Sequence, residues 1–132
     1  FVRRDGTDVA NIGENITDNI TDVVIGNPVT HTVTYTDDGY TPKEITIKTG
    51  DTVVFRNASD RKTWPATAIH PTHTVYPGSD ITNCDGPNKW KMFDACEPLP
   101  PGGVMGFTFD EVGTWFYHDH LRPSAVGTIV VQ

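Results

Sequence analysis

Short segments of alternating polar and apolar residues, each bounded by turn-forming residues, constrain this 132-residue chain more than any other feature of its sequence. Val33 and Tyr35 alternate with threonines, and Ile45 and Ile47 alternate in the same way within "KEITIK". Successive side chains of a strand point to opposite faces, so this spacing predicts strands that each bury one row of side chains. No segment has the spacing of an amphipathic helix. The pattern therefore predicts one all-β domain, a sandwich or a barrel.

The predicted strands occupy residues 29–57, 104–118 and 126–132. Residues 58–80 are rich in proline and small residues and predict a loop, and residues 80–103 carry both cysteines and four prolines. Residues 1–22 are polar and lack a clear period, which predicts an extended or flexible lead-in before a domain over residues 23–132.

The composition excludes two classes of partner. A formal net charge of −7, without a cluster of lysine and arginine, argues against a nucleic-acid binder. No apolar run approaches the roughly 18 residues that a membrane span requires. The chain begins at Phe1 without methionine, which fits a removed signal peptide or anchor.

The two cysteines, Cys84 and Cys96, lie in the broken segment between the predicted strands. An even number of cysteines in such a loop favours a disulfide that closes it, and the alternative is two free thiols. A disulfide would indicate an oxidising, extracytoplasmic compartment: the periplasm, the cell surface or the medium.

Two pairs of histidines carry the chemical information of the sequence. His118 and His120 are two residues apart at the end of a predicted strand, so their imidazoles share one face and can reach a common metal ion. His70 and His73 flank Pro71, whose ring restricts the backbone of this loop and of the residue before it. The alternative is that these histidines form hydrogen bonds in turns. The remaining histidine, His31, is expected to be a solvated residue.

Two stretches of the chain resemble the cupredoxin family. "DDGYTPKEITIKTGDTVVFRN" is similar to the amino-terminal half of the family's signature, and "FTFDEVGTWFYHDHLRPSAVGTIVV" is similar to its second half. In addition, "HPTH" and "GTWFYHDHL" resemble the histidine motifs of multicopper oxidases. The resemblance implies a Greek-key β-sandwich with the metal at one end, which brings His70 and His73 next to His118 and His120.

The departures from the family pattern are equally informative. His118 occupies the position of the family's cysteine ligand, or Asp119 does if the oxidase motif is used for the alignment. Ala125 or Val126 stands where the family has its methionine. A blue copper site requires a thiolate, so these replacements exclude one. The sequence instead predicts a mononuclear, thiolate-free site that binds copper, with zinc as the alternative.

Three further residues are predicted near this site. Asp119 alternates away from the two strand histidines and could hold the second ring nitrogen of a ligand histidine. Tyr76 and Tyr117 could line the site, although aromatic residues at such positions more often serve packing alone.

The resulting prediction is a protein that binds, buffers or delivers copper, with another copper or redox protein as its partner. Electron transfer is the first alternative, weakened by the missing thiolate. A small copper oxidoreductase is the second, and it would require an open coordination position. A structural sandwich without metal is the third, and the histidine pairs argue against it.

Overall fold

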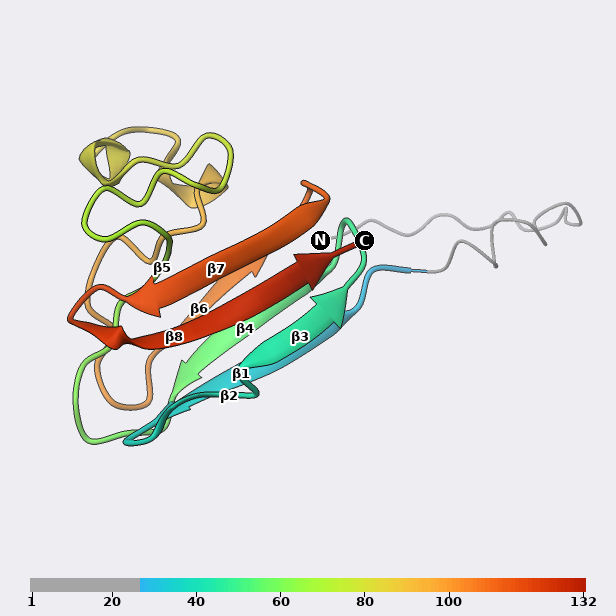
Figure 1. Cartoon of the computed structure of the whole chain (residues 1–132). Helices are drawn as coiled ribbons and strands as arrows, with labels where there is room; N and C mark the ends of the chain where they lie inside the picture. Colours follow the sequence, from blue (N-terminus) through green and yellow to red (C-terminus); the bar gives the residue numbers. More distant parts are fainter. Residues whose placement is uncertain (1–26) are drawn as a thin grey trace, which may run out of the picture.

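The structure, a computed structural model, describes residues 27–132, so the predicted lead-in of residues 1–22 and the predicted domain start at residue 23 lie outside the described residues. Eight strands and two short 3-10 helices form the described part, without any α-helix. The strands build two four-stranded sheets that pack face to face (Figure 1). The prediction of an all-β sandwich is thereby confirmed. No helix in residues 27–132 has the length and apolarity needed to cross a membrane.

The first sheet has the order β2-β1-β4-β6. Its strands are β1 (Thr30–Thr36), β2 (Gly39–Thr41), β4 (Thr52–Asn57) and β6 (Val104–Thr108). β1 runs parallel to β4, whereas the β1–β2 and β4–β6 pairs are antiparallel. The strands predicted from the alternation of Val33 and Tyr35 and from the run before "FRN" are thus neighbours in one sheet.

The second sheet has the order β3-β8-β7-β5. Its strands are β3 (Glu44–Ile47), β5 (Pro65–Thr67), β7 (Gly113–Asp119) and β8 (Arg122–Val131). β3 runs parallel to β8, and β7 is antiparallel to both of its neighbours. This sheet carries the chain into the "HDH" segment at the end of β7.

One strand was not predicted, and another begins earlier than predicted. β5 lies inside the segment predicted as a loop, because three residues are too few to display an alternation. β8 begins at Arg122 instead of residue 126, with Pro123 as its second residue. β3 pairs with β8 only from Thr128 onward, so Pro123 lies in the part of β8 that this neighbour does not reach.

A cluster of aromatic side chains fills the space between the sheets. The predicted inward residues Val33 and Tyr35 are buried, as are most of the aromatic residues of the strands. Phe93 joins this core from the long loop between β5 and β6, where it stacks on Phe107 at a centroid distance of 5.6 Å. Burial of a large aromatic ring provides a substantial apolar contribution, so this contact fastens the loop to the sandwich.

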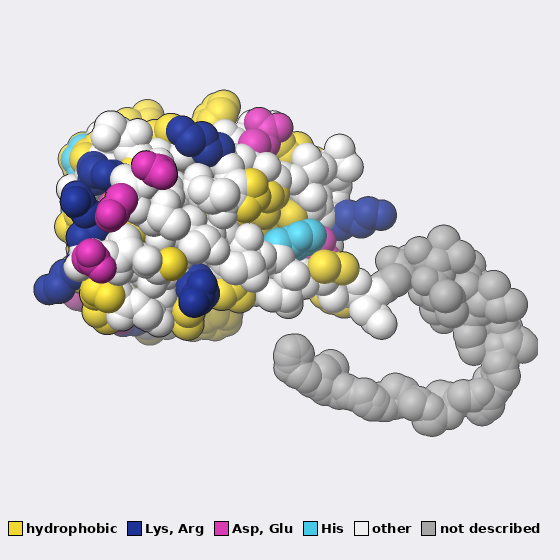
Figure 2. Space-filling model, turned by 90° about the horizontal axis from the view of Figure 1, so that it is seen from below, with side chains coloured by type: hydrophobic (Ala, Val, Ile, Leu, Met, Phe, Trp, Pro, Cys, Tyr) yellow, Lys and Arg dark blue, Asp and Glu magenta, His cyan; other side chains and the backbone are white. Residues whose placement is uncertain are grey.

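The loop between β5 and β6 forms a lobe at one end of the sandwich, above β5 and the end of β7 (Figure 1). It contains two 3-10 helices, η2 (Ile81–Asn83) and η3 (Lys89–Lys91). Cys84 and Cys96 form a disulfide, which confirms the predicted pairing. On the face of the protein drawn in Figure 2, the lysine and arginine side chains lie beside aspartate and glutamate side chains.

Candidate metal centre

Four histidines are brought together where β7 ends beside the long loop. β5 pairs with β7, with Ala66 opposite His118, so the chain leaving β5 passes next to the end of β7. That chain carries His70 and His73, and the turn after β7 carries His120. The neighbourhood inferred from the family resemblance is therefore present in the fold.

The four imidazoles form a compact set. Each offers one ring nitrogen, and these nitrogens lie within 4.8 Å of one another. His73 Nε2 is 3.1 Å from His120 Nδ1, and the rings of His73 and His118 are 4.9 Å apart. His73 and His118 are buried, His120 is half-buried and His70 is exposed. The set is thus buried on one side and open to solvent at His70.

The backbone presents His73 in an unusual conformation. Its φ of 58° lies in the left-handed region, which costs a residue with a Cβ atom roughly 1–2 kcal/mol. Hydrogen bonds on either side stabilise it: His73 N donates to Ile69 O at 2.7 Å, and Ile81 N donates to Thr72 O at 2.9 Å. Non-glycine residues held in this way are concentrated at functional sites.

Asp94 holds the His73 ring. Its Oδ2 is 2.7 Å from His73 Nδ1, and neither side chain is exposed to solvent. Its Oδ1 accepts a hydrogen bond from Trp64 Nε1 at 2.7 Å. With the proton on Nδ1 directed at the carboxylate, His73 Nε2 carries the lone pair and faces the other histidines. A carboxylate that orients a histidine in this way is typical of metal ligands.

The surroundings of two of the four imidazoles, those of His118 and His120, favour the neutral form. Burial, followed by the neighbouring His73, His70 and His120 rings, lowers the pKa of His118 to about 4. Burial and the rings of His73 and His70 also lower the pKa of His120. A histidine binds a metal ion through an unprotonated ring nitrogen. Surroundings that disfavour protonation of His118 and His120 therefore suit the binding of a cation.

One nitrogen in the cluster provides a test of fit. His118 Nε2 is buried and has no hydrogen-bond partner among residues 27–132. A buried polar atom without a partner is costly, and a metal ion would satisfy it. The residues present therefore fit a metal ion that is bound by histidine ring nitrogens.

The interaction predicted for Asp119 is made by Asp94 instead. Asp119 Oδ1 accepts hydrogen bonds from the backbone N–H groups of Trp64 at 2.9 Å and Leu121 at 3.0 Å. Its carboxylate therefore stabilises the turn that carries His120 and does not contact a histidine ring nitrogen. The pairing of β7 with β8 is irregular between His118 and Asp119, so a simple strand alternation does not hold at this step.

The two predicted tyrosines belong to the core. The Tyr76 hydroxyl accepts hydrogen bonds from the backbone N–H groups of Asp110 and Glu111, away from the histidines. The Tyr117 ring packs between the sheets, 5.0 Å from the ring of Tyr40 and 5.3 Å from that of Phe55. These contacts are packing contacts, the alternative noted for both residues, and Tyr117 also lines the hollow next to His70 and His118.

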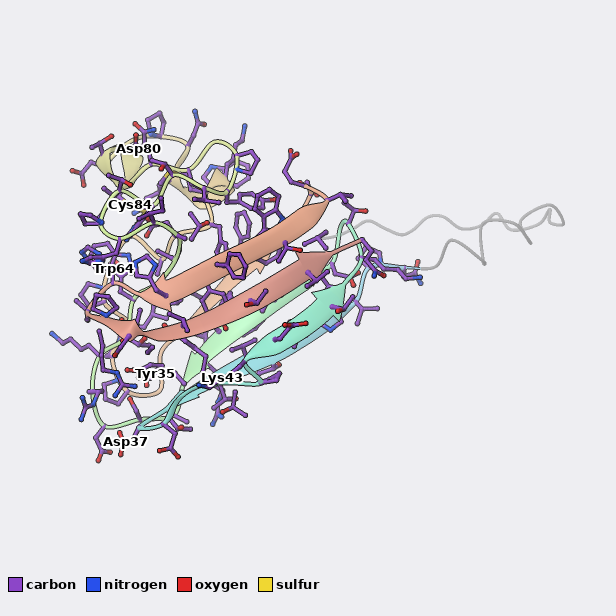
Figure 3. All side chains as sticks on the ribbon, in the orientation of Figure 1. Tyr35, Asp37, Lys43, Trp64, Asp80 and Cys84 are labelled. Carbon is purple, nitrogen blue, oxygen red and sulfur yellow. A yellow bond between two sulfur atoms is a disulfide. The ribbon has the colours of Figure 1, made fainter. Side chains whose placement is uncertain are left out.

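Sequence reasoning missed two residues at this site, Asp94 and Trp64. The Trp64 ring lies 4.6 Å from the His120 ring and covers one side of the cluster. Figure 3 shows Trp64 at this end of the sandwich, below Asp80 and Cys84 of the loop. Asp94 follows His73 by 21 residues across a segment without periodicity, so no local pattern could have connected them.

An open apolar hollow of about 510 Å³ adjoins the cluster. His70 and His118 form one part of its lining, and Ile69, Phe116 and Val126 contribute exposed apolar side chains. The histidine cluster therefore borders an exposed apolar surface.

No family model matches the sequence, and no curated protein matches it. Solved structures do match. A purple cupredoxin from Nitrosopumilus maritimus has a TM-score of 0.59 and 17% sequence identity, over 77% of this chain and 99% of that chain. A mutant of amicyanin in its reduced Cu(I) form at pH 4 has a TM-score of 0.56 and 19% identity, over 78% and 82%. An oxidised amicyanin mutant has a TM-score of 0.56 and 20% identity, over 77% and 81%.

Proposed function

Because this chain has the cupredoxin fold, we propose that it binds one copper ion through His70, His73, His118 and His120 and serves to buffer or deliver copper. The four converging ring nitrogens, within 4.8 Å of one another, carry the proposal. The buried, unpartnered Nε2 of His118 supports it, because such an atom requires a partner.

The four imidazole nitrogens limit which metals the site would prefer. Imidazole nitrogens suit copper and zinc, and the affinity order of divalent metals favours copper. Two of the three solved structures reported above are amicyanins, and one of these two is described as a Cu(I) form. Copper is accordingly the proposed metal, and zinc is the competitor that a binding experiment must exclude.

The site is proposed to be non-blue. Both cysteines of the chain are joined in the Cys84–Cys96 disulfide, and residues 27–132 contain no free thiol. A blue site needs a thiolate with two imidazoles. A centre ligated by imidazole alone would have weak visible absorption.

The disulfide also supports an extracytoplasmic location. Disulfides persist in oxidising compartments and are rare in the cytosol. A copper-buffering or copper-delivering protein in the periplasm, at the cell surface or in the medium would exchange its ion with another copper or redox protein.

Titration of metal-free protein with Cu(II), followed by electron paramagnetic resonance of the loaded form, tests the proposal. We expect one tightly bound equivalent, weak visible absorption and hyperfine structure from nitrogen ligands. Tighter binding of zinc than of copper would contradict the choice of metal. Absence of any stoichiometric metal would contradict the function.

The apolar hollow beside His70 and His118 favours one alternative, a small copper oxidoreductase, because an enzyme needs a path by which a substrate reaches the metal. Turnover of a substrate by the copper-loaded protein would establish this alternative. Electron transfer would instead require a reversible Cu(I)/Cu(II) couple, and copper delivery would require exchange with a second copper protein.

A further inference from the structure

We propose that the Cys84–Cys96 disulfide sets the metal affinity of the histidine cluster, with Asp94 as the positioning residue that connects the two. The inference rests on the proposed copper binding and adds a redox control to it. Two sets of contacts connect the disulfide with His73, one through the side chain of that histidine and one through its backbone.

The side-chain route passes through Asp94. Cys96 N donates to Asp94 Oδ1 at 2.8 Å, and Asp94 Oδ2 contacts His73 Nδ1 at 2.7 Å. The backbone of Cys96 has a φ of 60°, in the left-handed region that a residue with a Cβ atom rarely adopts. The disulfide restrains Cys96 at this position, so the N–H that orients the Asp94 carboxylate is restrained with it.

The backbone route passes through η2. Cys84 N donates to Ile81 O at 3.1 Å, and Ile81 N donates to Thr72 O at 2.9 Å. Thr72 directly precedes His73, whose left-handed conformation depends on its neighbours. The disulfide thus joins the two segments that hold the ring and the backbone of His73, the most tightly held member of the cluster.

Reduction of the disulfide would release both segments. A dithiol reductant supplies two electrons and two protons, the S–S bond breaks, and two cysteine thiols form while the dithiol becomes a disulfide. Cys96 is then free to leave its left-handed conformation, and Asp94 loses one of its donors. Trp64 Nε1 still contacts Asp94, so the metal affinity falls without vanishing. By linkage, bound metal makes the disulfide harder to reduce by the same factor.

The double variant Cys84→Ser/Cys96→Ser tests the coupling without a reductant that would also react with Cu(II). Competition with a chelator measures the Cu(II) affinity of the variant and of the wild type. We expect an affinity about 10-fold lower, at the lower end of the 10- to 100-fold range typical of groups that orient metal ligands. Trp90→Ala is the matched control, because Trp90 lies in the same loop, is 70% exposed and takes no part in the hydrogen bonds of either route.

A double-mutant cycle with Asp94→Asn tests the route. If Asp94 transmits the effect, Asp94→Asn lowers the affinity by a larger factor in the wild type than in the serine variant, where Trp64 alone still holds Asp94. Additive losses would refute transmission through Asp94. In metal-free protein, nitrogen-15 NMR of the His73 ring gives a separate readout: the Nδ1–H signal should weaken through faster exchange when the disulfide is absent.

The outcomes separate this inference from the proposed function. Copper binding by the wild type with unchanged affinity in the serine variant overturns the coupling alone. No copper binding by the wild type overturns both. If the serine variant does not fold, nitrogen-15 NMR of the metal-free wild type before and after reduction by a dithiol decides the matter, since an unchanged His73 Nδ1–H signal in the reduced protein would overturn the coupling.

Discussion

Two histidine–aspartate pairs lie at the two ends of this sandwich. His73 and Asp94 are 2.7 Å apart at the metal end, and neither side chain is exposed. His31 and Asp51 are 2.9 Å apart at the other end, with 28% and 7% of their side chains exposed. β8 connects the two ends: Arg122 pairs with Asp119 of the metal end, and Gln132 lines a hollow together with His31.

The difference lies in what surrounds each pair. Asp51 also accepts hydrogen bonds from the backbone N–H groups of Val29 and Lys48, so its carboxylate joins the start of β1 to the turn before β4. His73 instead directs its second ring nitrogen at three other imidazoles. A histidine–aspartate pair by itself therefore says little about metal binding. The groups around the second nitrogen distinguish a structural pair from a candidate ligand.

The largest effect is expected from removing a ligand at the metal end. His118→Ala should lower the copper affinity by more than about 100-fold, beyond the range for groups that only orient ligands. The strands should remain, because His118 lies at the end of β7. Copper titration and far-ultraviolet circular dichroism measure the two results.

His31→Ala is the matched control for this comparison. It removes the other paired histidine and should leave copper binding unchanged, including the rise in melting temperature that a ligand of the folded state produces. If His31→Ala lost copper and His118→Ala retained it, the roles assigned to the two ends would be reversed.

A smaller effect, on stability alone, is expected from Asp51→Ala. The loss of hydrogen bonds to a carboxylate should reduce the free energy of unfolding by about 1–3 kcal/mol at pH 7. Copper affinity should not change. Denaturant unfolding of the metal-free protein measures the first quantity, and titration measures the second.

The pH dependence of Asp51→Ala has a defined sign. Burial alone would raise the pKa of Asp51, but hydrogen bonds from His31 and from the N–H groups of Val29 and Lys48 outweigh it and lower the pKa. The stabilisation is therefore present above the carboxyl's ordinary pKa of 3.8 and is lost as the pH falls through the lowered value. A stability difference between wild type and variant that stayed constant from pH 7 down to pH 2 would contradict an ionised clamp.

The smallest effect is expected from Trp64→Phe. Phenylalanine retains a ring beside His120 but removes the Nε1–H that donates to Asp94. We expect copper affinity to fall about 3- to 10-fold, less than for groups in direct contact with a ligand. Trp90→Phe, at an exposed indole, is the control and should have no effect. Equal effects of the two substitutions would show that the Trp64–Asp94 contact does not support the site.

Much of the fold could be predicted because its signals are local. The alternation around Val33 and Tyr35 identified β1 and the side that it buries, since the period of a strand repeats every two residues. The three-residue β5 was not predicted, because three residues are too few to show a period of two. Its position depends on pairing with β7, and only the folded chain provides that partner.

The contacts of the histidines likewise divide into those that the sequence indicated and those that it did not. The spacing of His118 and His120 placed two imidazoles on one side of a strand end, and the family resemblance brought the other two histidines to them. His31 was expected to be solvated, yet it pairs with Asp51, 20 residues away in the sequence. No pattern within either segment indicates that contact.

The sequence by itself determined most of the strands, the candidate ligands and the two cysteines available for a disulfide, because periodicity and residue type act over a few neighbouring positions. The tertiary structure alone decided which groups support those ligands. Asp94 reaches His73 across 21 residues, Trp64 reaches Asp94 across 30, and His120 meets His73 across 47. Such contacts form only when the long loop packs onto the sandwich, through Phe93 in the core and the disulfide above it.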